Sequence, residues 1–452
     1  MCGIAGFCNF KENFEENTDY WNFRLEKMRA VLAHRGNDAR GRFLKKHIGL
    51  SHSRLAIRDI LCGDQPMTRT HNGYDYTICY NGEIYNTDEL IPELSENGFV
   101  CSTTSDTEVI LYAYIHWGAD FVSRLNGIFA FAIWDAAKNR LLLYRDRVGV
   151  KPLFFAIRGD SLVFGSEPKA CFAHPAVKPE LDKQGLQELL AIGPAHTSGL
   201  SLFKDLFEVL PGHFMIYSKD GLHDETYWEL TSREHTDSYQ DTVAHTRFLV
   251  EDAIKRQMVS DVPVCTFLSG GIDSSIVTAI AANYMNTRGK TLNTFSFDFK
   301  DNDKYFKANA FQPERDLPYV NRMLEEYETA HSYLECDENS LFKALFAAVD
   351  AKDMPGMTDV DSSLLYFCSL VSRKNKVALT GECADEIFGG YPWFYRKELL
   401  ERYGFPWSSD VAPRLALLRN DVALELDLSD YQAFRYEESR SKAPLLYGET
   451  GE

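Results

Sequence analysis

The 452-residue sequence predicts two domains, an α+β domain of packed sheets and helices followed by an α/β domain built on a parallel sheet. A chain of this length exceeds what one ordinary hydrophobic core contains, so at least two domains are expected. Short apolar stretches separated by turn residues dominate the first half. Strand and helix patterns alternate in the second half, which indicates parallel strands joined by right-handed crossovers.

The composition excludes several classes of protein. Hydrophobic residues make up 45% and charged residues 25% of the chain, which is typical of globular proteins. The net charge of −18 argues against non-specific binding to nucleic acids or anionic membranes. The ten cysteines are scattered without a C-x-x-C pair, so we expect no zinc site and a cytosolic location. The short apolar start and the lack of an apolar run of about 18 residues predict neither a signal peptide nor a membrane span.

In the first half, alternating patterns and turn signals predict strands, and apolar residues every three or four positions predict helices. The expected strands are 2–10, 48–57, 77–80, 128–135, 140–145, 153–157 and 161–164. The expected helices are 20–33, 87–96 and 106–117. Asn81-Gly82-Glu83 is expected to form a turn. We predict a first domain over 1–215 and a polar linker over 216–240, which contains Asp220-Gly221.

The second domain is predicted over 241–452. Its expected strands are 262–268, 291–297, 331–335 and 376–380. Its expected helices are 241–258, 273–286, 317–327, 340–350, 361–374 and 384–389. Ligands of parallel sheets bind at the carboxyl ends of the strands. The loops Ser269–Ser275 and Thr380-Gly381-Glu382 both follow such ends, so we expect them to face one site.

The loop Ser269-Gly270-Gly271-Ile272-Asp273-Ser274-Ser275 is suited to a phosphate. Its glycines allow close approach, and the following helix directs N–H groups and its positive dipole end to an anion. Its serines add hydroxyl donors, and Asp273 can hold a magnesium ion. The sequence G-x-x-x-x-G-K-[ST] is not found here, so the loop differs from the P-loop of kinases and GTPases. The alternative is a tight strand–helix turn in which Ser and Asp act as N-caps.

Cys2 directly follows the initiator methionine. A small second residue permits removal of Met1, which leaves a cysteine with a free α-amine. The unperturbed pKa is about 8.5 for the thiol and about 8 for the amine, so one residue can supply both nucleophile and base. A cysteine at position 2 is incidental in most proteins, and its significance here depends on other residues.

Four other residues complete a pattern for acyl chemistry. The Asn81 amide and the Gly82 backbone N–H are suited to stabilise an oxyanion. Arg54 can bind a substrate carboxylate in a bidentate manner, and Asp106 can pair with an ammonium group. Each has a structural alternative: Asn81-Gly82 as a hairpin turn, Asp106 as a helix N-cap and Arg54 as a surface charge. Their conjunction with Cys2 favours the functional interpretation.

With these residues, nearly the whole chain resembles the glutamine-dependent asparagine synthetases. The shared motifs are M-C-G-I-A-G-F at the start, A-H-R-G at 33–36, S-R-L-A-I at 53–57, Y-N-G-E-I-Y-N at 80–86, S-D-T-E at 105–108, R-D-R-x-G-x-K-P-L at 145–153, S-G-G-I-D-S-S at 269–275 and G-E-C-A-D-E-I-F-G-G-Y at 381–391. The resemblance implies an N-terminal nucleophile glutaminase domain, an αββα sandwich of class II. A PP-loop ATP pyrophosphatase-type synthetase domain with a parallel sheet would follow it.

The resemblance also implies the roles of residues in the first domain. Mature Cys2 would attack the side-chain amide of glutamine, with Asn81 and Gly82 as the oxyanion hole. The implied glutamine-binding residues are Arg54, Leu55, Ala56, Ile57, Arg58, Asn81, Gly82, Glu83 and Asp106. Arg54 would hold the α-carboxylate, and Asp106 and Glu83 the α-ammonium. Ammonia would then travel through an internal, mainly apolar tunnel.

In the second domain, the resemblance implies that the β-carboxylate of aspartate attacks the α-phosphate of ATP, giving an aspartyl adenylate and pyrophosphate. The implied ATP-binding residues are Phe267, Leu268, Ser269, Gly270, Gly271, Asp273, Ser274, Ser275, Phe297, Thr380 and Gly381. Asp273 and Asp385 would hold Mg²⁺. Glu382 would bind the intermediate or transfer a proton there. Acidic residues in the first turn of a helix are the structural alternative for Glu382 and Asp385.

The sequence departs from the family in two places. Thr380 and Cys383-Ala384 stand where the family more often has serine, glycine and serine, which are small residues as well. Family members continue beyond this length into more helices, and they supply a lysine for adenylate chemistry that is not recognisable after Tyr391. We therefore expect the C-terminal part of the synthetase domain to be missing.

The leading hypothesis is synthesis of asparagine from aspartate, glutamine and ATP. A second hypothesis keeps this chemistry with another carboxylate acceptor, because the acceptor site is not identified. The region that would form it contains acidic residues without an assigned role, at Asp316, Asp353, Asp359 and Asp361. A third hypothesis, a non-catalytic glutaminase-like protein, is disfavoured by the complete Cys2 pattern. We expect no nucleic-acid or membrane partner, and a homodimer is the common assembly in the family.

Overall fold

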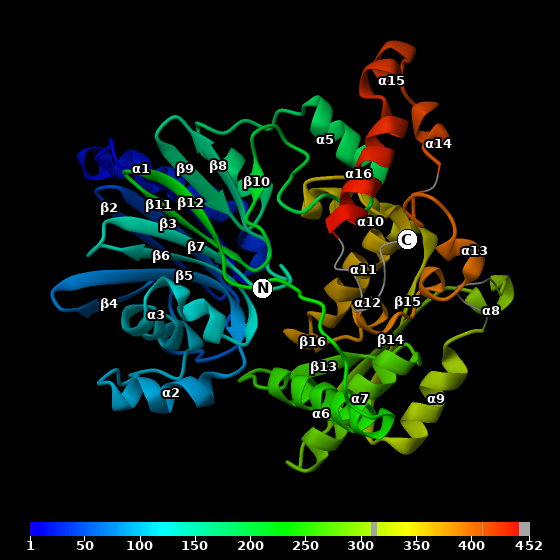
Figure 1. Ribbon diagram of the computed structural model, residues 1–452. Helices are drawn as coiled ribbons and strands as arrows, with labels where there is room; N and C mark the ends of the chain where they lie inside the picture. The colour runs from blue at the N-terminus through cyan, green and yellow to red at the C-terminus, as the bar shows by residue number, and fades with distance from the viewer. Residues whose placement is uncertain (309–313, 409, 443–452) are drawn as a thin grey trace. The chain divides into compact units, whose positions relative to one another are not determined.

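The computed structural model describes residues 1–308, 314–408 and 410–442 (Figure 1). The chain divides into two units. Unit 1 comprises Met1–Ser232 and Leu418–Leu428, and unit 2 comprises Arg233–Leu417 and Ser429–Glu452. None of the helices in the described ranges has the length and apolarity needed to cross a membrane.

Unit 1 contains two six-stranded antiparallel sheets, visible in Figure 1. The first has the order β10-β8-β9-β1-β3-β2 and consists of β1 (Gly3–Asn9), β2 (Ala39–Lys45), β3 (Ile48–Arg54), β8 (Phe154–Arg158), β9 (Ser161–Gly165) and β10 (Phe207–Glu208). The second has the order β12-β11-β7-β6-β5-β4 and consists of β4 (Met67–His71), β5 (Tyr74–Ile84), β6 (Gly127–Asp135), β7 (Arg140–Arg145), β11 (His213–Ser218) and β12 (Gly221–Thr226).

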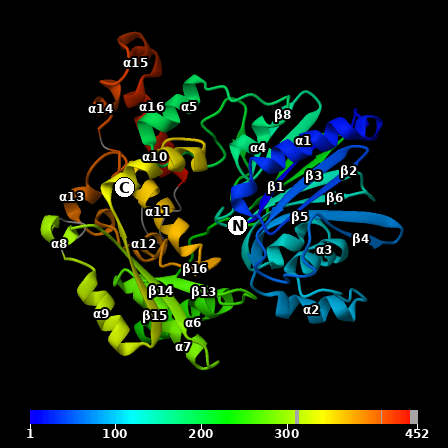
Figure 2. The same ribbon diagram turned by 180° about the vertical axis from the view of Figure 1, so that it is seen from behind.

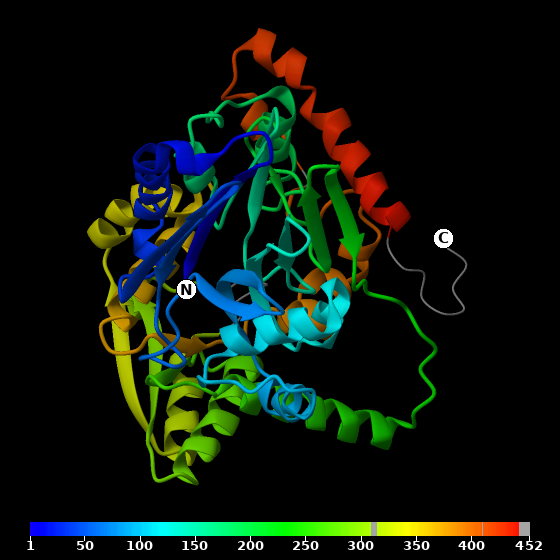
Figure 3. The same cartoon turned by 90° about the vertical axis from the view of Figure 1, so that its left-hand side faces the viewer.

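Three hydrophobic clusters divide unit 1 into four layers. The central cluster joins both sheets through residues such as Ile4 and Leu50 on one side and Ala130 on the other. On the outer face of the first sheet, α1 (Thr18–Ala30) and α4 (Pro168–Phe172) pack together (Figure 2). On the outer face of the second, α2 (Thr87–Glu96) packs beside α3 (Asp106–Trp117) (Figure 3). The predicted αββα sandwich is therefore confirmed, and its remaining helices are α5 (Lys183–Gln187) and α15 (Asn420–Leu426).

Two sequence predictions in unit 1 are wrong. The predicted turn at Asn81-Gly82-Glu83 lies inside β5, where these residues pair with Ala130, Phe129 and Ile128 of β6. The ladder to β6 continues to Ile84, so the Asn-Gly pair is extended instead of turning. The predicted linker over 216–240 begins within a hairpin. Strand β11 pairs with β12 because its alternating apolar residues bury against the sheet, and Asp220-Gly221 marks the hairpin turn.

Unit 2 is an α/β unit with a four-stranded parallel sheet, as predicted. The order is β15-β14-β13-β16, with β13 (Val264–Phe267), β14 (Leu292–Phe299), β15 (Thr329–Cys336) and β16 (Val377–Leu379). Its helices are α6 (Tyr239–Gln257), α7 (Ile272–Asn286), α8 (Asn302–Tyr305), α9 (Leu317–Glu326), α10 (Glu338–Lys352), α11 (Thr358–Val371), α12 (Ala384–Phe388), α13 (Lys397–Leu400), α14 (Ala412–Leu415) and α16 (Leu428–Lys442). Val264 and Cys265 belong to separate hydrophobic clusters, because successive strand residues point to opposite faces of the sheet.

Candidate functional site

The pairing of β1 with β3 positions Cys2. Gly3 lies opposite Ser53 in this antiparallel ladder, so Cys2 faces the end of β3. The Cys2 Sγ lies 3.4 Å from the backbone nitrogen of Leu55 and 3.6 Å from its carbonyl oxygen. Arg35 donates from Nε to the Cys2 carbonyl oxygen at 2.9 Å. The nucleophile is thus held from both sides, through its side chain and its main chain.

Burial sets the protonation of the N-terminal groups. It raises the pKa of the Cys2 thiol, and this effect exceeds the opposite effect of the Leu55 N–H. Burial also lowers the pKa of the Met1 amine to about 5, with Arg35 and Lys151 adding repulsion. At neutral pH the Cys2 thiol is therefore protonated and the Met1 amine is neutral, so burial at this site favours the uncharged form of both groups.

Strand β5 supplies the predicted oxyanion donors. Asn81 is 1% exposed, and its Nδ2 has no hydrogen-bond partner among the described residues. An unpaired buried donor is destabilising by about 1–3 kcal/mol, so such a group in a native protein needs an explanation. Gly82, the next residue, pairs with Phe129 in the β5–β6 ladder. The unpaired Asn81 donor is the feature that an oxyanion site requires.

Two carboxylates, the partly buried Glu83 and the buried Asp106, lie close enough to influence each other. Asp106 begins α3 and accepts hydrogen bonds from the Tyr80 hydroxyl (2.8 Å) and the Ile84 N–H (3.0 Å). Burial raises the pKa of Asp106, and burial together with the Asp106 charge raises the pKa of Glu83 to about 8. The Arg58 charge opposes both shifts. A ligand cation would stabilise this acidic pair in the same way.

The Arg54 guanidinium is engaged by the loop that follows it. Its Nη1 donates to the Ile60 carbonyl (3.1 Å) and to the Asp64 carboxylate (3.0 Å). Its Nη2 donates to the Arg58 and Asp59 carbonyls, at 3.4 Å and 2.5 Å. Asp64 is the exposed member of this set, since 77% of its side chain is accessible. Asp64 therefore occupies the position in which a substrate carboxylate could pair with Arg54.

The other predicted lining residues follow β3 directly. Leu55 directs its N–H to Cys2 Sγ, and the Ala56 N–H donates to Asp38 Oδ2 at 2.8 Å. Ile57 is partly exposed. Arg58 donates to the Ile84 carbonyl (2.9 Å) and to Thr87 Oγ1 (3.2 Å). Since Arg58 also acts on Glu83 and Asp106, its side chain belongs to the acidic pair's surroundings.

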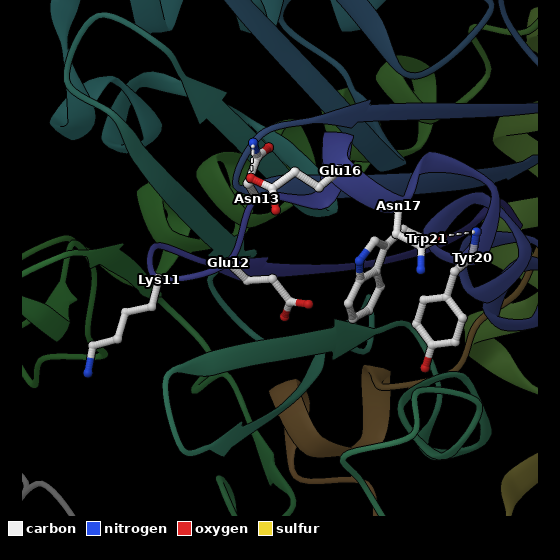
Figure 4. Close-up of a pocket in the computed structure, with 7 residues that line it drawn as sticks. All are labelled: Lys11, Glu12, Asn13, Glu16, Asn17, Tyr20 and Trp21. Atoms are coloured by element: carbon white, nitrogen blue, oxygen red, sulfur yellow. Dashed lines mark hydrogen bonds between the residues drawn. The ribbon is translucent and has the colours of Figure 1, made fainter.

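A surface hollow of about 400 Å³ lies elsewhere in unit 1, at the start of α1 (Figure 4). Its lining residues are Lys11, Glu12, Asn13, Glu16, Asn17, Tyr20 and Trp21. Asn13 Nδ2 donates to Glu16 Oε1 at 3.0 Å, and Asn17 Oδ1 accepts from the Tyr20 backbone at 3.4 Å. No predicted site residue lines this hollow, and local helix capping explains its polar groups.

In unit 2, the Ser269–Ser275 loop joins β13 to α7. Ser274 Oγ lies 3.0 Å from Ser269 Oγ and donates to the Gly271 carbonyl at 3.1 Å, which closes the turn. Gly270 has a φ of +84°, a conformation that favours glycine. Asp273 lies in the first turn of α7. Serine hydroxyls and the N-terminus of α7 therefore converge at this loop.

The turn after β16 packs against this loop, as predicted. Strands β13 and β16 are parallel neighbours, so their carboxyl ends share one sheet edge. A Cβ added at Gly381 would lie 2.8 Å from Asp273 Cβ and 2.8 Å from the Ser274 nitrogen. The turn at Gly381 thus lies against the Ser269–Ser275 loop, and the missing side chain of Gly381 permits this close approach.

Asp273 and Asp385 form a second acidic pair. Burial and the Asp385 charge raise the pKa of Asp273. Asp385 lies in α12, three residues after Glu382, which is exposed. No group of three or more His, Cys, Asp or Glu side chains in the described ranges could hold a metal by itself. Two carboxylates with open coordination fit Mg²⁺, which commonly takes one or two carboxylates together with substrate phosphates.

The residues predicted to flank the adenine differ in their exposure. Leu268 is 1% exposed, its N–H donates to the Phe295 carbonyl and its carbonyl accepts from the Ser296 hydroxyl, so the residue offers almost no surface to a ligand. The rings of Phe267 and Phe297 both pack against Phe367 of α11, at centroid distances of 4.6 Å and 5.0 Å. Both residues are partly exposed. The unassigned Asp361 pairs with Lys352 at 2.8 Å.

Sequence reasoning missed the cations around Cys2. Arg35 belongs to the motif A-H-R-G and Lys151 to the motif R-D-R-x-G-x-K-P-L. The motifs alone predicted no role for either residue. Arg35 is fixed by Glu167, through an ion pair of 2.7 Å. Arg35 lies in a short 3-10 helix and Lys151 in the loop between β7 and β8, both far from Cys2 in sequence, so only the tertiary structure places them beside it.

Comparisons with known proteins cover both units. A family described as glutamine amidotransferase domain matches residues 1–228, and one described as asparagine synthase matches 245–451. Asparagine synthetase [glutamine-hydrolyzing] 3 of Bacillus subtilis (strain 168) is 48% identical over 452 residues, which is 100% of this chain and 73% of that protein. Asparagine synthetase [glutamine-hydrolyzing] 1 of the same organism is 33% identical over 88% of this chain and 60% of its own length. A solved glutamine phosphoribosylpyrophosphate amidotransferase from B. subtilis is 16% identical, with a TM-score of 0.39 over 86% of this chain and 97% of that one.

Proposed function

The chain belongs to the glutamine-hydrolysing asparagine synthetase family, and we propose that it makes asparagine from aspartate, glutamine and ATP. The predicted domain 1–215 would carry the glutaminase reaction, and 241–452 the ATP-dependent ligation. The observation that carries the proposal is the buried, unpaired Asn81 Nδ2 on the strand beside a fixed Cys2. It leaves a hydrogen-bond donor ready for an oxyanion.

In the glutaminase reaction, the α-amine of mature Cys2 accepts the thiol proton, and the thiolate attacks the amide carbon of glutamine. Asn81 Nδ2 and the Gly82 N–H stabilise the resulting oxyanion. Return of the proton to the amide nitrogen releases ammonia and leaves a thioester. Water then hydrolyses the thioester to glutamate, through a second oxyanion on the same donors.

Glutamine recognition uses charges at both ends of the amino acid. We assign its α-ammonium to Asp106 and Glu83, and the raised pKa values of both carboxyls support this, because a nearby cation favours their charged forms. Its α-carboxylate pairs with Arg54 in place of Asp64. Main-chain groups of residues 55–58 line the part of the pocket that holds the glutamine side chain.

In the ligation, the Ser269–Ser275 loop and Thr380-Gly381 hold the phosphates of ATP, and partly exposed Phe267 and Phe297 flank the adenine. The aspartate β-carboxylate attacks the α-phosphorus, and pyrophosphate leaves. Asp273 and Asp385 would hold Mg²⁺, which supplies charge neutralisation for the phosphates. Exposed Glu382 is assigned to the adenylate intermediate. Ammonia then displaces AMP and forms asparagine.

The net charge of −18 supports a function without nucleic-acid or membrane partners, and the scattered cysteines support a cytosolic location. A homodimer is the assembly proposed from the family, and light scattering measures it directly.

Two assays test the proposal. Incubation with ATP, aspartate and ammonia should give AMP, pyrophosphate and asparagine, and a panel of other carboxylates should give less product. Formation of ADP and phosphate, or preference for another carboxylate, would contradict it. The variant Cys2→Ala should lose glutamine-dependent product and keep ammonia-dependent product. Retention of both activities would refute the glutaminase assignment.

A further inference from the structure

Lys151 ends a loop whose main chain is held by two neighbouring side chains. The Asp146 carboxylate accepts from the N–H groups of Val150 and Lys151, each at 2.9 Å. The Arg145 guanidinium donates to the carbonyls of Gly149 and Lys151, each at 3.1 Å. The backbone of Lys151 is therefore bonded on both its N–H and C=O sides, which defines where its side chain starts.

The Lys151 ammonium is buried without a carboxylate partner. The residue is 7% exposed, and its Nζ contacts the thioether sulfur of Met1 at 3.0 Å. Within the described ranges, no acidic side chain lies within ion-pair distance of Nζ. A thioether is a weak acceptor, and buried lysines usually have a strong one. This cation is thus directed at the N-terminus and not at a compensating anion.

Arg35 is the second cation there, but its charge is compensated. It pairs with Glu167 at 2.7 Å while its Nε holds the Cys2 carbonyl. The charged and titratable groups that influence the pKa of the Met1 amine are the Cys2 thiol, Arg35, Lys151 and Glu83. The groups that influence the pKa of Lys151 are Arg35, Glu83, Asp146 and Cys2. Among the described residues, Lys151 is therefore the cation beside Cys2 that has no direct ion-pair partner, while Glu83 and Asp146 act on it from a greater distance.

We propose that Lys151 is a positioning residue of the glutaminase reaction, whose ammonium keeps the α-amine of mature Cys2 unprotonated so that it can accept the thiol proton. This inference rests on the proposed function. Removal of Met1 takes away the thioether contact and converts the peptide nitrogen of Cys2 into the α-amine. A cation nearby disfavours protonation of that amine and favours the thiolate.

The test compares wild type with Lys151→Met, Lys151→Gln and Lys151→Arg. The exposed turn residue Lys138 provides the matched control, Lys138→Met. Mass spectrometry first establishes Met1 removal in each variant. We expect the acidic limb of the pH profile of glutaminase kcat/KM to move to higher pH by about one unit in both neutral variants. On that limb, kcat/KM should fall roughly tenfold at a given pH. Lys151→Arg should restore the wild-type limb, and ammonia-dependent synthesis should stay unchanged.

A second measurement separates this inference from the function on which it rests. The pH dependence of Cys2 alkylation by iodoacetamide should shift in the same direction in the neutral variants, whether or not glutamine is hydrolysed. If wild type hydrolyses no glutamine at any pH, the proposed function fails and the alkylation profile still decides the role of Lys151. Superimposable profiles of wild type and neutral variants overturn the inference. So does an equal loss at every pH, which indicates a structural role. If Lys151→Met does not fold, Lys151→Gln provides the same comparison.

Discussion

Arg54 Nη1 and Asp64 Oδ1 lie 3.0 Å apart, and the two side chains differ strongly in exposure, at 6% and 77%. The pair therefore joins a buried cation to a carboxylate that can leave into solvent at small cost. If glutamine binds as proposed, Asp64 competes with its α-carboxylate for Arg54.

The first prediction follows from that competition. Asp64→Ala should lower the KM for glutamine by about two- to fivefold, the effect of losing an ion pair of this exposure. Steady-state glutaminase kinetics measure it. The control is Asp160→Ala, which removes the exposed ion pair of 2.9 Å with Lys11. An unchanged KM in Asp64→Ala would show that glutamine does not displace Asp64.

The second prediction concerns Asn81. Asn81→Ala should lower glutaminase kcat by about 100- to 1,000-fold, as expected for loss of an oxyanion donor. Its Tm should change little, because Nδ2 forms no hydrogen bond in the described protein. Activity assays and thermal melts measure these effects, and ammonia-dependent synthesis serves as the internal control. A large fall in Tm with a small fall in kcat would assign Asn81 a structural role.

The third prediction concerns pH. The pKa of Glu83 is about 8 in the folded protein and 4.5 as its ordinary value, so the folded state binds more protons between these limits. The contribution of Glu83 to stability is complete below pH 4.5 and is lost as the pH rises to about 8. Glu83→Gln should therefore flatten the fall of the unfolding free energy between pH 5 and about 8. Urea denaturation across this range measures it, with the exposed Glu96→Gln as control.

The fourth prediction concerns the phosphate site. In Gly381→Ala the new Cβ would displace the Asp273–Ser274 backbone, and a shift of about 1 Å lowers activity about 100-fold. AMP-forming synthesis with ammonia should fall by this factor, while glutaminase activity is retained. Gly289→Asn is the control, because this glycine has a φ of +66° in open space and asparagine tolerates that conformation. Full synthesis in Gly381→Ala would show that the turn does not contact ATP.

Local patterns predicted much of the fold. The expected helices 87–96 and 106–117 have the observed bounds of α2 and α3, because apolar spacing runs through both segments and Ser105 caps α3 directly before its first residue. The four strands of the parallel sheet were all expected, because each is a short apolar run between helices. The hairpin β11–β12 was missed, because its outer strand is polar on its exposed side and its turn resembles a linker. Asn81-Gly82 was assigned to a turn because local propensity ignores pairing with β6.

By itself, the sequence determined the chemistry that the chain carries: Cys2 after the initiator, the Ser269–Ser275 loop and the acidic pattern around Asp385 are all contiguous or nearly so. Only the tertiary structure decided how distant groups combine. Pairing of β1 with β3 places Leu55 against Cys2, and the packing of β5 leaves Asn81 Nδ2 unpaired. The loop that Arg145 and Asp146 hold directs Lys151 at the N-terminus, 150 positions away in the chain. Electrostatic and hydrogen-bond interactions depend on distance and burial in space, and strand pairing sets both.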